Sequence, residues 1–372
     1  MSIFLFAFLL ITFLSLTIEI IRLKRSIKHI PVRILVNGTR GKTSTVRMMY
    51  RIFLENKYKV NAKTTGEEPV LWKSNGQSEL LHRFAPANII ENLRIIRDWA
   101  GKNTQVAVLE CMALHPEMQH TLAWKIFDPT HTFITNIGND HFEVMGKNLQ
   151  EITETILQSS TNKNILFIPA EYSNAKIEAG RIETYNPEKS PVDDIPIPPV
   201  VLDSHWGLIH VFIDHFGLDF ETGVKIFRQE WMRNVEQMRY VNNQKNYTFW
   251  NLFSVNDSDS AAYLLAHIMP EIKRSRSCIT IFNARRDRPL RTESFASMMD
   301  SLPSDTVVWI MGSGTCLCRR LFRKNLPGRK IELISIRKII KIIEAGFKVN
   351  TCLIGLGNTR GIQTLLKGFG QE

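Results

Sequence analysis

The stretch VNGTRGKTSTVRMMY, residues 36–50, decides the fold class because three signals meet in it. It overlaps the end of a short apolar run, RILV, which predicts a strand, and it then carries a turn with Gly38 and Gly41. After the turn, Val46 and Met49 recur at helical spacing. A strand, a glycine turn and a helix start form a phosphate-binding loop, because backbone N–H groups and the helix N-terminus point at one anion.

The residue types in this loop indicate a nucleotide and a metal ion. Lys42 is predicted to contact the β- and γ-phosphates of ATP, and the Thr43 hydroxyl to join the coordination of Mg²⁺. The spacing is G-x-x-G-K-T, shorter than the common G-x-x-x-x-G-K-[ST], because Val36 stands where the longer pattern has its first glycine. The alternative is an unrelated glycine turn before a helix. The candidate nucleotide-binding residues are Gly38, Thr39, Arg40, Gly41, Lys42, Thr43 and Ser44.

Composition describes ordinary globular material with a basic balance. The chain has 372 residues, 44% hydrophobic and 22% charged, enough for about two domains. Its five cysteines are scattered and include no C-x-x-C pair, so neither a disulfide framework nor a zinc site is expected. The net charge of +11 favours an anionic partner, and the alternative is a basic solvated surface. No stretch interleaves basic and aromatic residues, so nucleic acid is not predicted as a partner.

The first residues predict a membrane anchor. Residues 1–18 carry no charged side chain, whereas residues 19–28 contain one acidic and four basic residues. This length is close to the roughly 18–20 residues that cross a bilayer, and the flanking charges place the remainder of the chain in the cytoplasm. We therefore expect a single-pass protein of the cell membrane with cytoplasmic domains. A cleaved signal peptide and a buried helix are the alternatives, although a signal peptide has its positive charge before the apolar run.

Beyond the anchor, strand-like and helix-like runs alternate, which indicates an α/β fold with largely parallel sheets. The first series contains RILV, QVAVLE, HTFITNI and NILFIP, and the second contains YTFWNLFSV, CITIF, TVVWIMG, KIELIS and TCLIGL. Between them, residues 239–246 are polar and mark the boundary of the two units. The predicted domains are 1–22, 30–240 and 246–372.

Two strand ends carry candidate metal ligands. Glu110 ends the run VAVLE, and His141 follows the segment TNIGND. Since ligands of open α/β sheets lie beyond the carboxyl ends of the strands, both can converge with Thr43. That set is rich in oxygen and suits Mg²⁺ or Mn²⁺ bound to ATP. Taken singly, a strand-end Glu or His is more often a surface residue.

The motifs GTRGKT, LECM and TNIGNDH, in this order, resemble the Mur ligase superfamily of ATP-dependent amide-forming ligases. Within it, the likeness is strongest to the catalytic subunits of membrane-bound poly-γ-glutamate synthases, which serve capsule synthesis. The segments that carry it are VNGTRGKTS, PANIIENLRIIR, LECMALHPEMQ, FSVNDSDSAAY, NARRDRP and GLGNTRGIQTLL. The resemblance implies a Mur-ligase-like central P-loop ATPase domain and a C-terminal Rossmann-like domain, with a transmembrane helix where murein ligases have a UDP-binding domain.

The resemblance also implies a reaction and residues for it. ATP would phosphorylate a carboxylate, an amine would attack the acyl phosphate, and ADP and phosphate would leave behind a γ-amide between two glutamates. Lys42 and His141 fall on catalytic positions, and Thr43, Glu110 and His141 on positions that bind Mg²⁺ or Mn²⁺. Further nucleotide-binding candidates are Asn256, Asp257, Asp259, Arg286 and Asp287, and substrate-binding candidates are Arg83 and Arg288.

One departure concerns a second metal. Murein ligases usually carry a carbamylated lysine about fifteen residues after the metal-binding histidine, where this chain reads EITETILQSS. Either Glu151 or Glu154 substitutes for it, or only one metal is held tightly. Arg40 stands where murein ligases commonly have asparagine, which favours the polymer-forming branch.

The expected partners are glutamate, an anionic polyglutamate chain, the membrane and separate integral-membrane subunits for export, while a homo-oligomer is left open. Three alternatives remain at this stage. The first is a folylpolyglutamate-like or murein-type ligase, and the second is a P-loop ATPase that powers transport. The third is a scaffold subunit, which the intact loop residues Gly41, Lys42 and Thr43 disfavour.

Overall fold

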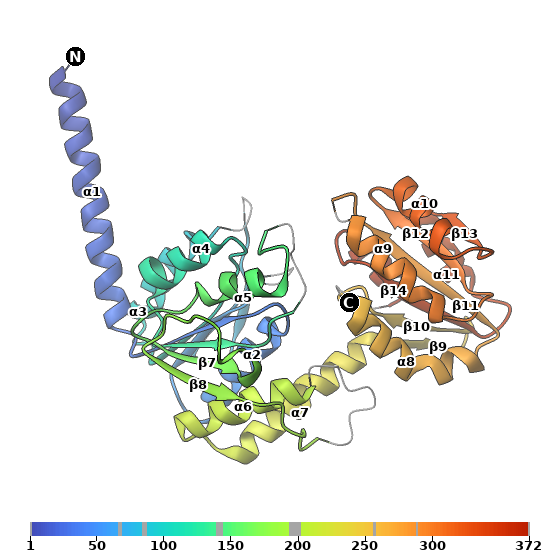
Figure 1. Cartoon of the computed structure of the whole chain (residues 1–372), viewed down its shortest axis with the longest axis horizontal. Coiled ribbons are helices and arrows are strands. Elements are labelled where there is room, and N and C mark those ends of the chain that lie inside the picture. Colours follow the sequence, from blue (N-terminus) through green and yellow to red (C-terminus); the bar gives the residue numbers. More distant parts are fainter. Residues whose placement is uncertain are drawn as a thin grey trace. The chain divides into compact units, whose positions relative to one another are not determined.

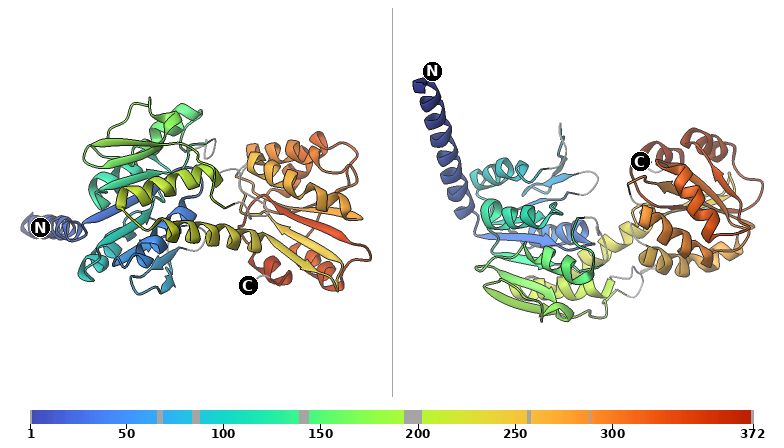
Figure 2. Two further views of the ribbon diagram at one scale, coloured as in Figure 1. Left: turned by 90° about the horizontal axis from the view of Figure 1, so that it is seen from below. Right: turned by 45° about the horizontal axis from the view of Figure 1, so that its top comes forward.

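The structure is a computed structural model of the chain. It describes residues 2–65, 69–83, 88–138, 144–192, 202–255, 258–287 and 289–370. By their contacts, these residues form two units, one within residues 1–227 and the other within residues 228–372. Each unit has a central β-sheet with helices packed on both faces (Figures 1 and 2).

The sheet of the first unit has eight strands in the order β4-β3-β2-β5-β1-β6-β7-β8. From β2 to β8 all neighbours are parallel, and β3 and β4 add an antiparallel hairpin at one edge. Val36 pairs with both Glu110 and Phe133, so the carboxyl ends of β1, β5 and β6 lie together. The strands are β1 Val32–Asn37, β2 Val60–Lys63, β3 Val70–Trp72, β4 Ser78–Leu80, β5 Val106–Glu110, β6 His131–Ile134, β7 Ile165–Pro169 and β8 Arg181–Tyr185.

Helices cover both faces of this sheet. The end of α1, α3 and the π-helix η1 share one apolar cluster with β1 and β5, whereas α2 and α6 meet on the opposite face, where Phe53 packs against Phe212. The helices are α1 Ser2–Lys28, α2 Lys42–Glu55, α3 Glu91–Gly101, α4 Pro116–Thr121, η1 Leu122–Phe127, α5 Leu149–Leu157, the 3₁₀ turn η2 Ala170–Tyr172, α6 Leu202–Phe216 and α7 Phe220–Met238.

Helix α1 is longer than the predicted anchor of residues 1–22. An 18-residue window within Phe4–Lys28 has a mean hydropathy of 2.5, so by length and composition the helix can cross a membrane. The helix continues past the apolar run because Leu23 and Ile27 are buried against α3. Glu19 also pairs with Arg97 of α3.

The second unit has a six-stranded sheet in the order β13-β12-β11-β14-β10-β9, parallel except for β9. Helices α8, α9 and α10 share the apolar cluster on one face, and α11 and α12 share the cluster on the other. The elements are β9 Arg239–Asn242, β10 Tyr247–Asn251, α8 Ser258–Arg274, β11 Ser277–Ala284, α9 Pro289–Met298, the 3₁₀ turn η3 Met299–Ser301, β12 Val307–Gly312, α10 Thr315–Asn325, β13 Ile331–Leu333, α11 Ile336–Ala345, β14 Thr351–Leu356 and α12 Gln363–Gly368.

The predicted α/β class with largely parallel sheets is confirmed, and each quoted apolar run contains a strand. Five strands were not predicted, namely β2, β3, β4, β8 and β9. Each of them has only three to five residues, too few for a clear alternation of apolar and polar positions. The domain bounds 1–22, 30–240 and 246–372 stay predictions.

Candidate active site

The predicted strand, glycine turn and helix are present at residues 32–55. Gly38 and Gly41 have φ angles of 131° and 74°, which only glycine adopts easily. A Cβ atom on Gly38 would lie 2.3 Å from the Thr135 hydroxyl oxygen, and one on Gly41 would lie 1.8 Å from Nε2 of His205. The loop is therefore packed to the limit that glycine allows, and α2 begins at Lys42 immediately after it.

Asn136, which follows β6, braces the loop. Its Oδ1 accepts hydrogen bonds from the Thr39 hydroxyl at 3.0 Å and from the Arg40 amide at 2.9 Å. Its carbonyl accepts from the Thr39 amide at 3.1 Å, and the Thr135 hydroxyl donates to the Arg40 carbonyl at 2.5 Å. Sequence reasoning used this segment only to find His141 and missed the role of Asn136. No local pattern could have shown it, because these hydrogen bonds join residues 96 and 97 positions apart.

Lys42 and Thr43 start helix α2 at the mouth of the loop. The Lys42 ammonium donates to the Gly38 carbonyl at 2.5 Å and lies 3.4 Å from that of Thr39. The helix N-terminus, its free N–H groups and this ammonium thus concentrate positive potential at one place. This arrangement suits an anion such as a phosphate chain.

Two of the predicted metal ligands, Thr43 and Glu110, lie in contact with each other. The Thr43 hydroxyl lies 3.0 and 3.1 Å from the two carboxylate oxygens of Glu110, and the Thr65 amide donates to Glu110 Oε2 at 2.7 Å. Glu110 is only 4% exposed, so little water screens its charge. These are hard oxygen donors of the kind that Mg²⁺ and Mn²⁺ prefer, and they fit the ion that the resemblance implies.

The third predicted ligand, His141, lies outside the described residues. Among the residues that are described, no three His, Cys, Asp or Glu side chains gather closely enough to hold a metal. Glu151 forms part of the cap of α5, because its carboxylate accepts from the Lys147 amide at 2.8 Å and the Asn148 side chain at 2.9 Å. Glu154 accepts from Gln150 at 3.1 Å.

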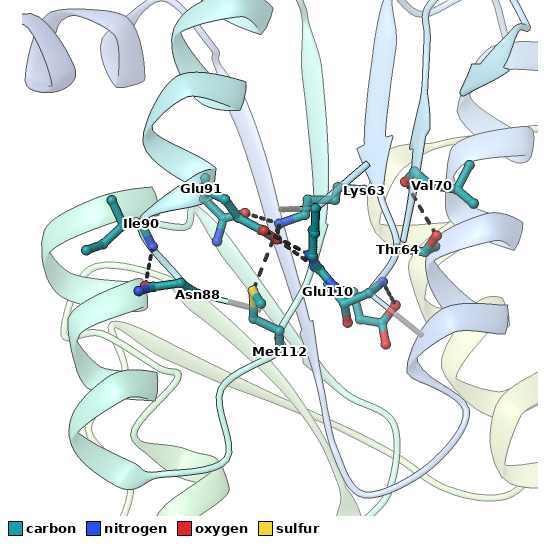
Figure 3. Close-up of polar contacts among 11 residues, drawn as sticks. Lys63, Thr64, Val70, Asn88, Ile90, Glu91, Glu110 and Met112 are labelled. Carbon is teal, nitrogen blue, oxygen red and sulfur yellow. Dashed lines mark hydrogen bonds and ion pairs between the residues drawn. The ribbon is translucent and has the colours of Figure 1, made fainter. Parts of the chain in front are cut away.

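A buried lysine adjoins this edge of the sheet and was missed by sequence reasoning. Lys63, the last residue of β2, has no exposed side-chain surface, and its ammonium donates to Glu91 Oε1 and Asn92 Oδ1, each at 2.5 Å (Figure 3). The Arg83 guanidinium donates two hydrogen bonds, of 2.6 and 2.9 Å, to the same Glu91 carboxylate. Met112 Sδ lies 4.0 Å from the ammonium. A lysine at the end of the short strand VNAK gave no pattern that would have singled it out.

The charges of this cluster act on one another. Burial lowers the pKa of Lys63, although its hydrogen bond with Glu91 and the charges of Glu91 and Glu110 oppose that change. For Glu91, burial alone would raise the pKa, but hydrogen bonds from Arg83 and Lys63 outweigh it and lower the pKa. The carboxylate is thus held ionised between two cations.

The candidate residues of the second unit follow β11. Arg285 binds Asp287 through two hydrogen bonds of 3.0 and 2.5 Å, and the Arg286 amide donates to the Ser313 hydroxyl at 3.2 Å. Of the other candidates, Asn256, Asp257 and Arg288 lie outside the described residues. Asp259 is in the first turn of α8, where only its backbone is described.

Comparison with known proteins identifies both units. Residues 36–189 match the Mur ligase middle domain, and residues 235–372 match the C-terminal domain of the poly-gamma-glutamate synthase CapB. In fold, the chain resembles folylpolyglutamate synthase of Mycobacterium tuberculosis, with a TM-score of 0.65 and 14% identity over 95% of this chain and 94% of that one. It also resembles MurF of Acinetobacter baumannii, with a TM-score of 0.65 and 13% identity over 94% and 78% of the two chains.

The two domain matches and the phosphate loop define the class: the chain is a Mur-type, ATP-dependent, amide-forming ligase. Within this class it is similar to poly-γ-glutamate synthases. It is 26% identical to the capsule biosynthesis protein CapB of Bacillus anthracis, over 91% of this chain and 76% of the relative. To the PGA synthase CapB of Bacillus subtilis it is 23% identical, over 91% and 90% of the two chains.

Proposed function

We propose that the chain elongates poly-γ-glutamate by forming γ-amide bonds between glutamates at the expense of ATP. One observation carries the proposal at atomic scale: Thr43 of the phosphate loop lies against the buried carboxylate of Glu110. The match of residues 235–372 to a CapB domain and the two CapB relatives support glutamate as the substrate.

The proposed reaction is a phosphoryl transfer followed by acyl transfer. A carboxylate oxygen of the acceptor attacks the γ-phosphorus of ATP, the bond to the β-phosphate oxygen breaks, and ADP leaves. The amine of the next glutamate then attacks the acyl carbon, loses a proton, and releases inorganic phosphate as the amide forms. Lys42 and the N-terminus of α2 supply positive charge where negative charge develops. Mg²⁺ held by Thr43 and Glu110 would neutralise further charge on the phosphates.

Other residue roles are part of the same proposal. We propose His141 as a further metal ligand and Arg288 as a substrate-binding residue. The proposed nucleotide-binding residues of the second unit are Asn256, Asp257, Asp259, Arg286 and Asp287. Arg83, predicted to bind substrate, has its guanidinium paired with Glu91, so we propose that it holds Glu91 in place at the start of α3.

Location and domain organisation complete the proposal. Membrane association agrees with the capsule-related relative and with the apolar helix α1. We propose a single-pass protein with an anchor at residues 1–22 and cytoplasmic domains at 30–240 and 246–372. Separate membrane subunits would export the polymer, because one helix cannot form a conduit.

Product analysis tests the function against its nearest alternative. The full chain in detergent is incubated with Mg²⁺-ATP and L-glutamate, D-glutamate, a γ-linked glutamyl oligomer or a folate as acceptor, and products are identified by mass spectrometry. Growth of the γ-linked oligomer by single glutamates supports the proposal. Extension of the folate alone would instead identify the chain as a folylpolyglutamate synthase. The only support for that alternative is the fold shared with the solved folylpolyglutamate synthases.

A further inference from the structure

A groove runs along α3 beside the candidate active site. It encloses a cavity of about 600 Å³ between α3 and the β3–β4 hairpin. Pockets that bind small ligands usually measure about 300–1,000 Å³. The charged lining of the groove includes Glu91, Arg94 and Asp98 of α3 and Lys102, which directly follows the helix. These residues recur every three or four positions and form one stripe of about 16 Å, at 1.5 Å per residue.

The lining of the groove leaves one positive charge without an ion-pair partner among the described residues. Its three lining carboxylates are all paired: Glu79 with Lys73, Asp98 with Lys102, and Glu91 with Arg83 and Lys63. Arg94 lines the groove and has no ion-pair partner among the described residues. The lining has three cations, Arg83, Arg94 and Lys102, and three carboxylates, and two of these carboxylates also pair with Lys63 and Lys73 from outside the lining. The positive charge left for a ligand is therefore that of Arg94.

The remaining wall is apolar. Leu71 and Leu81 come from the hairpin side, and Ile95 comes from α3. A ligand that fits this surface carries an anionic group for Arg94 and methylene groups for the apolar wall. A γ-linked glutamyl chain has this chemistry, because each residue adds one free carboxylate and two methylenes to the chain.

The groove is connected to the candidate active site through β2. Lys63 ends this strand and holds Glu91 at the start of α3. Two residues further on, the Thr65 amide donates to Glu110, which also accepts from Thr43. One end of the groove therefore lies at the carboxyl edge of the sheet, where the phosphate loop is.

We propose that this groove binds the growing γ-glutamyl chain behind its reactive end, with Arg94 pairing with a carboxylate of the polymer. The inference rests on the proposed function for the identity of the polymer. It adds a site that the reaction itself does not need, and it predicts that acceptor affinity rises with acceptor length.

Equilibrium binding of labelled γ-linked oligomers to the full chain in detergent, without ATP, tests the proposal. Arg94→Gln should weaken binding of long oligomers about threefold to tenfold, and Arg94→Glu more strongly. Binding of the dimer should not change, because it does not reach along the groove. Lys163→Gln is the matched control, since it removes one exposed positive charge outside the groove and should leave all affinities unchanged.

Equal affinities in Arg94→Gln and the unaltered chain would overturn the proposal, as would an equal loss in Lys163→Gln. A loss of binding to phosphatidylglycerol-containing micelles, with oligomer binding intact, would also overturn it and assign a lipid headgroup to the groove. Because ATP is left out, the result is independent of the ligase reaction. Length-dependent binding through Arg94 without any amide product would keep the groove and reject the proposed function.

Discussion

Glu110 is the residue on which the candidate active site depends most. Its buried carboxylate accepts from both the phosphate loop and the segment after β2. Glu110→Gln keeps the shape and the acceptor oxygen but removes the charge that would hold a divalent cation. We expect ADP formation to fall about a hundredfold or more, with nearly unchanged folding.

The measurement is the rate of ADP release across a Mg²⁺ titration, with Glu117→Gln as the control. Glu117 is an exposed residue of α4 and should tolerate the change. Full activity of Glu110→Gln at ordinary Mg²⁺ concentration would remove Glu110 from the metal site.

The stability of the fold should depend on the buried Lys63. Lys63→Met leaves the buried Asn92 oxygen without its donor and Glu91 with one cation fewer. Because removing one partner of a buried ion pair is costly, we expect the free energy of unfolding to fall by about 2–4 kcal/mol. Urea unfolding followed by tryptophan fluorescence measures this.

The control is Lys73→Met, which breaks the ion pair with Glu79 whose side chains are 37% and 50% exposed. It should cost about 1 kcal/mol or less. If both substitutions cost the same, the Lys63 cluster contributes no more than a surface pair.

At the scale of elements, β6 and α6 are joined by two histidines. The rings of His131 and His215 approach to 3.1 Å through their Nε2 atoms, and Thr130 contacts the other ring nitrogen of His131 at 2.8 Å. Burial first, and then the nearby His215 and Arg33, lower the pKa of His131 to about 4. The folded state therefore holds this ring neutral where the unfolded chain, with a pKa near 6.5, takes up a proton.

The lowered pKa of His131 makes the stability of the fold depend on pH. Stability is complete above about pH 6.5 and declines as the pH falls towards 4, because only the unfolded state gains the proton. We expect His131→Phe, which keeps the aromatic packing against Phe167, to lose less melting temperature between pH 7 and pH 5 than the unaltered chain. An identical decline in both proteins would show that other groups set it.

The elements also show what the sequence could predict. Long apolar strands such as β11 and the turn before α2 follow from local pattern alone, and both were predicted correctly. The strand β2 was not predicted, because four residues are too short a run to indicate a strand, and its polar residues Asn61 and Lys63 are buried as well. The Lys63 cluster was not predicted either. Its contacts join residues 28 and 29 positions apart, and only the fold brings these residues together. Thr43 and Glu110 could be paired in advance because both follow strands that end at one sheet edge.

At the scale of the whole molecule, we expect α1 to determine whether the protein is found at the membrane. Its exposed apolar residues include Phe4, Leu5, Phe6 and Phe8, and in water this surface would be unfavourable. Deletion of residues 2–18 keeps Glu19, which pairs with Arg97, and keeps the buried Leu23 and Ile27. We expect the shortened chain to move from the membrane fraction to the soluble fraction and to remain folded.

Cell fractionation with immunoblotting measures this, and thermal unfolding checks the fold. The matched control replaces residues 2–18 with an unrelated transmembrane segment, which should restore the membrane location. A shortened chain that stays with the membrane would mean that α1 is not the anchor.

The most direct test of the central claim couples ATP use to bond formation in the full chain. ADP release and new γ-amide bonds are counted together, with and without a glutamyl acceptor, in the unaltered protein and in Lys42→Ala. The account predicts one amide per ADP, little ADP without acceptor, and loss of both products in Lys42→Ala because the loop charge is gone. ADP released regardless of acceptor, with no amide formed, would contradict the account and indicate an ATPase that makes no bond.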